Sequence, residues 1–112
     1  MRRGEIWWAS LPEPEGSEPG YRRPVVIIQG DNFNQSNINT VVCSSITSNL
    51  KIANAPGNLR LPARVTGLRK PSVVNVSQLV TVDKRFLSKK VKTLEGKIMR
   101  RIDDGIRLVL NL

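Results

Sequence analysis

The sequence is 112 residues long, which fits one small domain spanning residues 1–112. It contains 18 Lys and Arg residues against 9 Asp and Glu residues, so its formal net charge at pH 7 is +9. A charge this high favours a polyanionic or acidic partner over a surface that is charged only for solubility. Residues 57–112 hold thirteen of the basic residues and four of the acidic ones, so we expect the second half to supply most of the positive field.

The composition also excludes several classes of protein. Cys43 is the only cysteine, so a disulfide within the chain is excluded, which fits a reducing cytoplasm. No apolar run approaches the roughly 20 residues that a membrane helix needs, and no signal peptide precedes the first charged residues. We therefore expect a soluble cytoplasmic protein.

The N-terminal part of the chain predicts a strand followed by a functional loop. Residues 4–9 are rich in strand-forming side chains, and we assign Trp7 and Trp8 to the core and a dimer-facing surface in preference to base stacking. Residues 10–24 hold four of the seven prolines and three of the nine acids, which indicates an exposed loop. The loop ends in two cations and a proline that pushes Arg23 toward an extended conformation at the mouth of a strand.

The middle of the chain predicts short strands separated by turns. Predicted strands cover residues 25–29, 40–46, 59–61 and 72–82, and predicted turns or loops cover residues 30–37, 50–58 and 66–71. Pro62 is expected to end the third of these strands. The turn at residues 66–71 is notably basic.

The C-terminal part predicts a change from strands to a helix. Asp83 is a candidate N-cap for one helical turn, and residues 89–92 form a lysine-rich edge strand. Apolar residues recur at helical spacing over residues 94–110, which predicts an amphipathic helix capped by Thr93. The fold class is therefore mostly β, a small barrel-like domain closed by a C-terminal helix.

The residue types that are missing restrict the chemistry. The sequence has no histidine, which excludes a Ser-His-Asp triad, a Cys-His pair and a two-histidine ribonuclease site. The acids form no D-x-D type cluster, so we expect neither a metal-dependent nuclease nor any cofactor. Electrostatic catalysis on a substrate that carries its own nucleophile remains, and RNA carries one in its 2′-hydroxyl group.

Two side chains are candidates for that role. An arginine fork binds two phosphate oxygens at once, and a threonine hydroxyl can donate one further hydrogen bond. Arg23 precedes one predicted strand and Thr47 follows the next. An antiparallel hairpin places the start of one strand beside the end of the other, so we expect the two side chains to meet.

Several stretches, spread over nearly the whole chain, resemble the MazF/PemK family of toxin endoribonucleases from bacterial type II toxin–antitoxin systems. They are Arg3-Gly4-Glu5-Ile6-Trp7, Gly16-Ser17-Glu18 with Arg23-Pro24, Ser45-Ile46-Thr47-Ser48, residues 66–74, Gln78 and residues 81–85. The resemblance implies an SH3-like barrel that forms a homodimer. It also implies cleavage of single-stranded RNA without a metal, as an mRNA interferase, with 2′,3′-cyclic phosphate and 5′-hydroxyl ends.

The same resemblance assigns roles to residues and names a partner. The family's catalytic arginine and threonine fall on Arg23 and Thr47. The implied RNA-binding residues are Ser17, Glu18 and Gln78, with Arg3 and Asn32 as further candidates and Arg22 as a general phosphate contact. The implied inhibitor is an acidic, MazE-like antitoxin whose tail blocks the groove, which suits a chain of charge +9.

Two other functions are compatible with this fold or with this positive charge. A gyrase-poisoning toxin acts through a protein interaction, and a plain RNA-binding module needs only the basic surface. The Arg23 and Thr47 pair favours catalysis over both. Pro19 and Ser77 depart from residues common in the family, so the cleavage sequence cannot be carried over.

Overall fold

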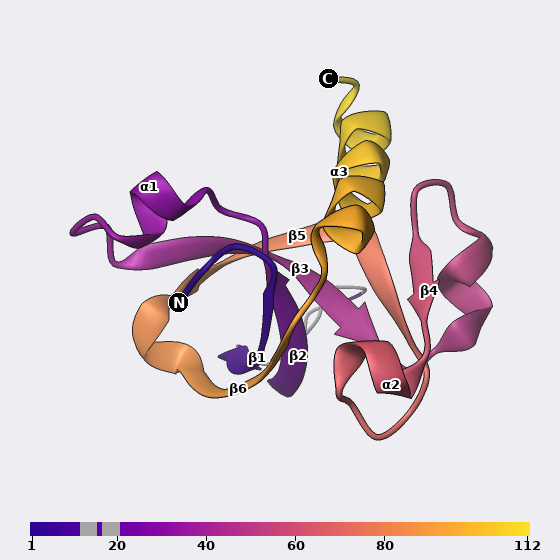
Figure 1. The fold of residues 1–112 in the computed structure, drawn as a ribbon, viewed down its shortest axis with the longest axis horizontal. Helices are drawn as coiled ribbons and strands as arrows, with labels where there is room; N and C mark the ends of the chain where they lie inside the picture. Colours follow the sequence, from indigo (N-terminus) through magenta and orange to yellow (C-terminus); the bar gives the residue numbers. More distant parts are fainter. Residues whose placement is uncertain (12–15, 17–20) are drawn as a thin grey trace.

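The computed structural model describes residues 1–11, 16 and 21–112. The strands are β1 (Glu5–Leu11), β2 (Tyr21–Ile27), β3 (Thr40–Thr47), β4 (Leu59–Leu61), β5 (Ser72–Asp83) and β6 (Leu87–Thr93). The helices are α1 (Asp31–Asn34), α2 (Ala63–Thr66) and α3 (Gly96–Leu110), with short 3₁₀ segments η1 (Leu50–Asn54) and η2 (Lys84–Phe86). Figure 1 shows α3 standing against one end of the sheet.

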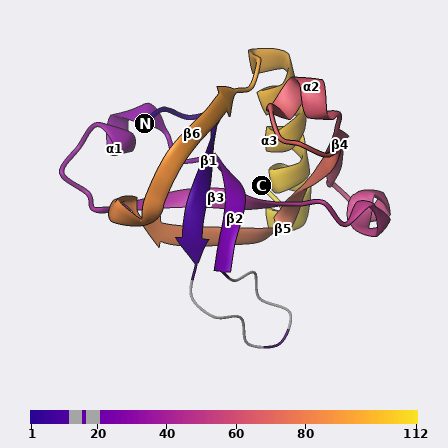
Figure 2. The ribbon, with the colours of Figure 1, turned by 90° about the horizontal axis from the view of Figure 1, so that it is seen from below.

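The six strands form one antiparallel sheet in the order β4-β5-β3-β2-β1-β6. Figure 2 shows β1, β2 and β6 running across the direction of β3 and β5, so the sheet curls into a half-barrel. The curl coincides with an irregularity in the β3–β5 ladder, where Ser44 pairs with Leu79 but Ser45 pairs with Asn75. The extra residues on β5 bend that strand, as bulges do.

Side chains satisfy the backbone groups that this irregularity frees. Asn58 accepts a hydrogen bond from the Val76 N–H at 3.0 Å. Asn75 accepts bonds from the N–H and the hydroxyl of Ser77 at 3.3 and 2.8 Å. Because these groups are paired, the bend can persist in a half-buried part of the sheet.

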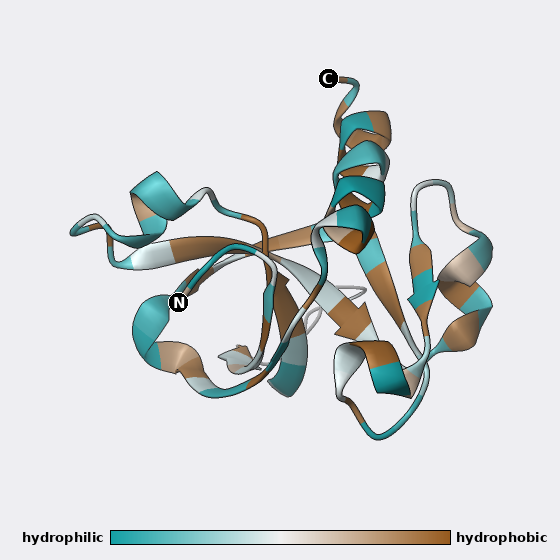
Figure 3. Cartoon of the chain, in the orientation of Figure 1, coloured by the Kyte–Doolittle hydropathy of each residue, from teal (hydrophilic) through white to brown (hydrophobic). Residues whose placement is uncertain are grey.

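Helix α3 closes one side of the half-barrel. Met99, Ile102 and Ile106 are buried in a cluster with residues of β1, β2, β3, β4 and β5. Figure 3 shows hydrophobic and hydrophilic residues alternating along α3, as an amphipathic helix requires. The helix approaches the turn before β4 so closely that a Cβ on Gly105 would lie 2.2 Å from the Gly57 carbonyl oxygen.

The sequence predicted the strands and the C-terminal helix, and the structure corrects several boundaries. The helix begins at Gly96 and not at residue 94, because the Glu95 backbone is extended and the Leu94 N–H bonds to the Gly4 carbonyl at 2.9 Å. Its N-cap is therefore Glu95 and not Thr93. The loop predicted over residues 10–24 is shorter, because Leu11 pairs with Tyr21.

Other local predictions have mixed outcomes. Asp83 does cap a helical turn, and its side chain accepts a bond from the Arg85 N–H at 3.0 Å. The lysine-rich strand β6 does lie at the sheet edge. The helices α1 and α2 were not predicted, since each lasts only four residues inside a segment rich in turn formers. No helix in the described ranges is long and apolar enough to cross a membrane.

Candidate functional site

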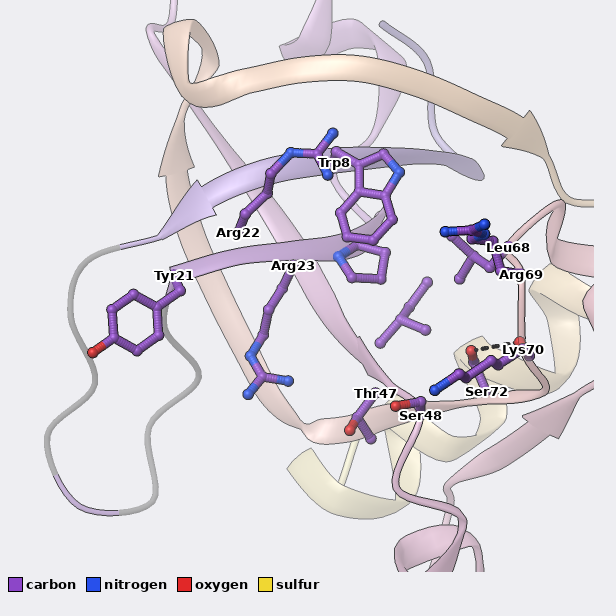
Figure 4. Close-up of a pocket in the computed structure, with 12 residues that line it drawn as sticks. Trp8, Tyr21, Arg22, Arg23, Thr47, Ser48, Leu68, Arg69, Lys70 and Ser72 are labelled. Atoms are coloured by element: carbon purple, nitrogen blue, oxygen red, sulfur yellow. Dashed lines mark hydrogen bonds between the residues drawn. The ribbon is translucent and has the colours of Figure 1, made fainter.

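A cavity of about 360 Å³ lies between the start of β2, the end of β3 and the segment after α2. Its described lining residues are Trp8, Tyr21, Arg22, Arg23, Pro24, Ile46, Thr47, Ser48, Leu68, Arg69, Lys70 and Ser72. Figure 4 shows these side chains surrounding a common opening. We call this hollow the main cavity.

The β2–β3 ladder brings Arg23 and Thr47 together. Val25 pairs with Ser45, so Arg23 and Thr47 follow at equivalent distances along the two strands. The Arg23 backbone is also paired to Ala9 of β1. In Figure 4 the Arg23 side chain extends from β2 toward the end of β3, where Thr47 lies. The predicted meeting of the two side chains in one cavity therefore has a structural basis in strand register.

Local hydrogen bonding orients the Thr47 hydroxyl. Its oxygen accepts a bond from the Asn49 N–H at 3.1 Å, where the chain turns out of β3. With one lone pair engaged in this way, the hydroxyl hydrogen remains able to donate toward the cavity. Thr47 is half-buried and Ser48 beside it is exposed, so a ligand can reach the hydroxyl.

The main cavity concentrates positive charge. Four of its lining residues are cations, namely Arg22, Arg23, Arg69 and Lys70, and none of the described lining residues is acidic. Arg69 and Lys70 come from the predicted basic turn. The chain enters this turn at Gly67, which adopts the left-handed conformation with φ of 78°. The sequence did not indicate that this turn would face Arg23. The arrangement can bind a phosphate and stabilise negative charge that develops on it.

Trp8 forms one wall of the main cavity. The guanidinium of Arg22 lies 4.3 Å from the centre of its ring, within the range of a cation–π contact. Trp7 behaves as predicted, since it packs against the core cluster of β1, β2 and β3 and donates a hydrogen bond to Glu5 at 3.0 Å. Trp8 lies on the opposite face of the strand, as period-two alternation requires, and its place on a dimer-facing surface stays a prediction.

The other predicted site residues lie outside the main cavity or outside the described ranges. Arg3 forms an ion pair with Asp103 of α3 and donates from Nε to the Ile28 carbonyl at 2.7 Å. Asn32 is exposed on α1, and Gln78 lies in the irregular part of β5. Ser17 and Glu18 lie outside the residues that the structure describes.

Groups with displaced pKa values lie away from the main cavity. Burial raises the pKa of Glu5, but hydrogen bonds from Trp7 and the Arg2 N–H, with the nearby Lys90, outweigh it and leave the pKa below its ordinary value. A hydrogen bond from the Arg3 N–H lowers the pKa of Asp31. Burial raises the pKa of Cys43 to about 12.

Metal ligands are not grouped in the part of the chain that the structure describes. No three residues of the His, Cys, Asp and Glu types come together there in a way that could hold an ion. The described residues instead form a curled β half-barrel with a cation-rich cavity at the end of a strand pair, and the described lining of that cavity includes no acid. That combination places the chain among small β-barrel proteins, with a cavity whose described cations could hold an anion.

Comparison with known proteins gives the family. Residues 2–110 match the family of PemK-like, MazF-like toxins of type II toxin–antitoxin systems, and the chain belongs to that family. It is 46% identical to endoribonuclease MazF6 of Mycobacterium tuberculosis, covering all of this chain and 98% of the relative. It is 31% identical to endoribonuclease EndoA of Bacillus subtilis, covering all of this chain and 96% of that protein.

Solved structures support the fold. The crystal structure of MazF from Deinococcus radiodurans superposes with a TM-score of 0.83 at 18% identity, covering all of this chain and 97% of that one. A mycobacterial endoribonuclease in complex with its cognate antitoxin superposes with a TM-score of 0.77 at 19% identity, covering all of this chain and 94% of that one. The predicted mostly-β barrel with a closing helix is confirmed.

Proposed function

We propose that this chain is an endoribonuclease toxin that cleaves single-stranded RNA at specific sequences without a metal ion. The observation that carries the proposal is the meeting of Arg23 and Thr47 in a cavity with four cations and no described acid. Family membership and the endoribonuclease relatives support it. In the proposed reaction the 2′-hydroxyl attacks the adjacent phosphate, the bond to the 5′-oxygen breaks, and the products carry 2′,3′-cyclic phosphate and 5′-hydroxyl ends.

Arg23 is the residue we assign to the phosphate. Its planar fork can bind two oxygens of the pentavalent phosphorane, and a guanidinium stays charged at physiological pH. Stabilising the developing charge suits this side chain better than exchanging a proton does. Strand pairing on the β1 side fixes its backbone, so little reorganisation is needed during reaction.

Thr47 is the second residue we assign to catalysis. Its hydroxyl lies in the same cavity and can donate one hydrogen bond to a phosphate oxygen. Arg22, Arg69 and Lys70 supply additional charge that attracts the RNA backbone. Ser17, Glu18 and Gln78 remain proposed groove contacts, and Arg3 and Asn32 remain candidates of the same kind.

We propose two protein partners in the cytoplasm. An acidic antitoxin would block the main cavity through charge complementarity. Structural neighbours solved in complex with an antitoxin support a partner of this class. A second copy of the chain would form a homodimer. Exposed apolar residues at the end of α3, including Leu108, Leu110 and Leu112, offer surface for association. Light scattering tests the dimer, and a protein that stays monomeric at micromolar concentration would contradict it.

The direct test is incubation of the purified protein with a long single-stranded RNA in excess EDTA. Discrete cuts with cyclic phosphate ends are expected from the wild type. Arg23→Ala is expected to lower the rate roughly 1,000-fold, and Thr47→Ala roughly 10- to 100-fold. A third variant, Lys97→Gln, removes a positive charge on α3 that does not line this cavity, and serves as a matched control.

The same experiment separates the competing functions. Binding of RNA without cutting, unchanged in Arg23→Ala and Thr47→Ala, would identify an RNA-binding module. Neither binding nor cutting would point to an interaction toxin of the gyrase-poisoning type.

A further inference from the structure

A second cavity adjoins the main cavity across Trp8. It measures about 340 Å³, and its described lining residues are Trp8, Gly67, Leu68, Arg69, Lys89, Lys90 and Val91. Three of these residues, Trp8, Leu68 and Arg69, also line the main cavity. The two hollows are therefore neighbours that share one wall. We call the second one the β6 cavity.

Strand pairing and helix packing build the β6 cavity. Trp8 of β1 pairs directly with Lys89 of β6. On the side of the cavity away from β1, α2 is held against β6, because the Lys92 ammonium donates a hydrogen bond to the Arg64 carbonyl at 2.7 Å. A Cβ on Gly67 would lie 3.1 Å from a methyl group of Val91, so this approach is close. The turn that carries Arg69 is thus fixed beside the lysines of β6.

The cations that line the β6 cavity differ in whether a nearby acid neutralises their charge. Lys90 forms an ion pair with Glu5 at 3.1 Å, so part of its charge is neutralised. Lys89 is exposed, and no ion pair to an acid of the described ranges engages it. Arg69 is exposed in the same way. No described residue that lines this cavity is acidic. Lys89 and Arg69 are therefore the groups available to an anionic ligand.

The wall between the cavities is suited to a planar ligand. Trp8 is half-buried, and the Arg22 guanidinium stacks on its ring at 4.3 Å from the centre. Nucleic acid bases stack on aromatic rings and on guanidinium planes, and this pair offers both. Figure 4 shows Trp8 and Arg22 on the side of the main cavity opposite Thr47. A strand that passes Thr47 and crosses the cavity therefore meets this pair next.

We propose that single-stranded RNA runs from the main cavity over Trp8 into the β6 cavity. A base flanking the cleaved phosphate stacks on the Trp8 and Arg22 pair, and the following phosphates contact Arg69 and Lys89. The inference rests on the proposed ribonuclease function and adds a binding subsite to it. A nucleic acid strand fits better than an acidic peptide. Its phosphates alternate with planar bases, and here cations lie on both sides of the Trp8 indole, so phosphates can meet the cations while a base stacks on the ring.

Cleavage kinetics on two lengths of RNA test the proposal. One substrate ends close to the cut on both sides, and the other extends by about ten nucleotides on each side. Trp8→Leu, Trp8→Phe and Lys89→Gln are compared with wild type and with Lys97→Gln. Trp8→Leu should raise KM for the long RNA about tenfold, whereas Trp8→Phe keeps a ring and should raise it less. Lys89→Gln should raise KM severalfold and lower the slope of log KM against log salt by about 0.7.

The outcomes decide between the two proposals. A wild type that cuts RNA, with variants whose ratio of long-RNA to short-RNA kcat/KM falls, supports the β6 cavity as a subsite. A wild type that cuts RNA, with Trp8→Leu and Lys89→Gln matching Lys97→Gln, overturns the subsite and leaves the ribonuclease function standing. A wild type that cuts no RNA overturns both. Because Lys89 is exposed, its variant remains informative even where Trp8→Leu fails to fold.

Discussion

Two regions of this molecule use arginine in opposite ways. At the junction of the N-terminus with α1 and α3, Arg3 meets Asp103 while its backbone meets Asp31, so positive and negative groups are matched. In the main cavity, Arg22 and Arg23 stand beside Arg69 and Lys70 with no described acid on the wall. The matched region holds elements of the fold together. The main cavity brings like charges close together among its described lining residues, a cost that a phosphate ligand can offset.

Among the variants that test this comparison, the largest effect is expected from one that keeps the charge of Arg23 and removes its fork. Arg23→Lys should lower kcat for RNA cleavage about 100-fold, because an ammonium cannot bind two phosphate oxygens in parallel. Single-turnover cleavage measures the rate, and urea denaturation checks that the variant is folded. Equal kcat in Arg23→Lys and wild type would show that charge alone suffices.

At the junction the expected effect is on stability and not on activity. Asp103→Asn should lower the free energy of unfolding by about 1 kcal/mol, since it breaks a partly exposed ion pair with Arg3. RNA cleavage should stay at the wild-type rate. Asp104→Asn, which affects an exposed pair with Arg107, is the control and should change little. Impaired cleavage in Asp103→Asn would connect the junction to the site and support Arg3 as an RNA contact.

Acid should weaken the junction through its carboxylates. The pKa values of Glu5 and Asp31 lie below their ordinary values of 4.5 and 3.8 in the folded state. The unfolded chain therefore takes up these protons first, and stability falls as the pH drops below about 4.5. Urea denaturation from pH 6 to 3 should show this loss, and Glu5→Gln should make it shallower. A stability that rises on acidification would contradict the assignment.

The smallest expected effect concerns Cys43, which lies in neither region. Its buried thiol has a pKa raised to about 12, so it should stay protonated and unreactive toward iodoacetamide at pH 8. Mass spectrometry should find modification only after unfolding. Cys43→Ala should leave cleavage unchanged. Rapid labelling of the native protein would show that the core around β3 opens readily.

Sequence patterns predicted the sheet because strand periodicity and turn residues are local signals. The same logic placed Arg23 beside Thr47, since hairpin register follows from the order of two neighbouring strands. Three features depended on distant parts of the chain. Arg69 faces Arg23 only because α2 packs on β6, and Trp8 lines a cavity only because the sheet curls around it. Arg3 engages Asp103 from the far end of the chain, a contact that no local pattern encodes.

The make-up of the main cavity has a consequence for control of the enzyme. Its described lining includes no histidine, carboxylate or cysteine, the side chains that most often change charge or oxidation state under cellular conditions. A modest shift in acidity or redox state would therefore leave the charges of the described lining residues unchanged. A molecule that competes for the same cations, such as the proposed antitoxin, would instead restrain the activity by occupying the site. In the proposed system, the amount of RNA-cleaving activity in the cell then depends on the ratio of the toxin concentration to the antitoxin concentration.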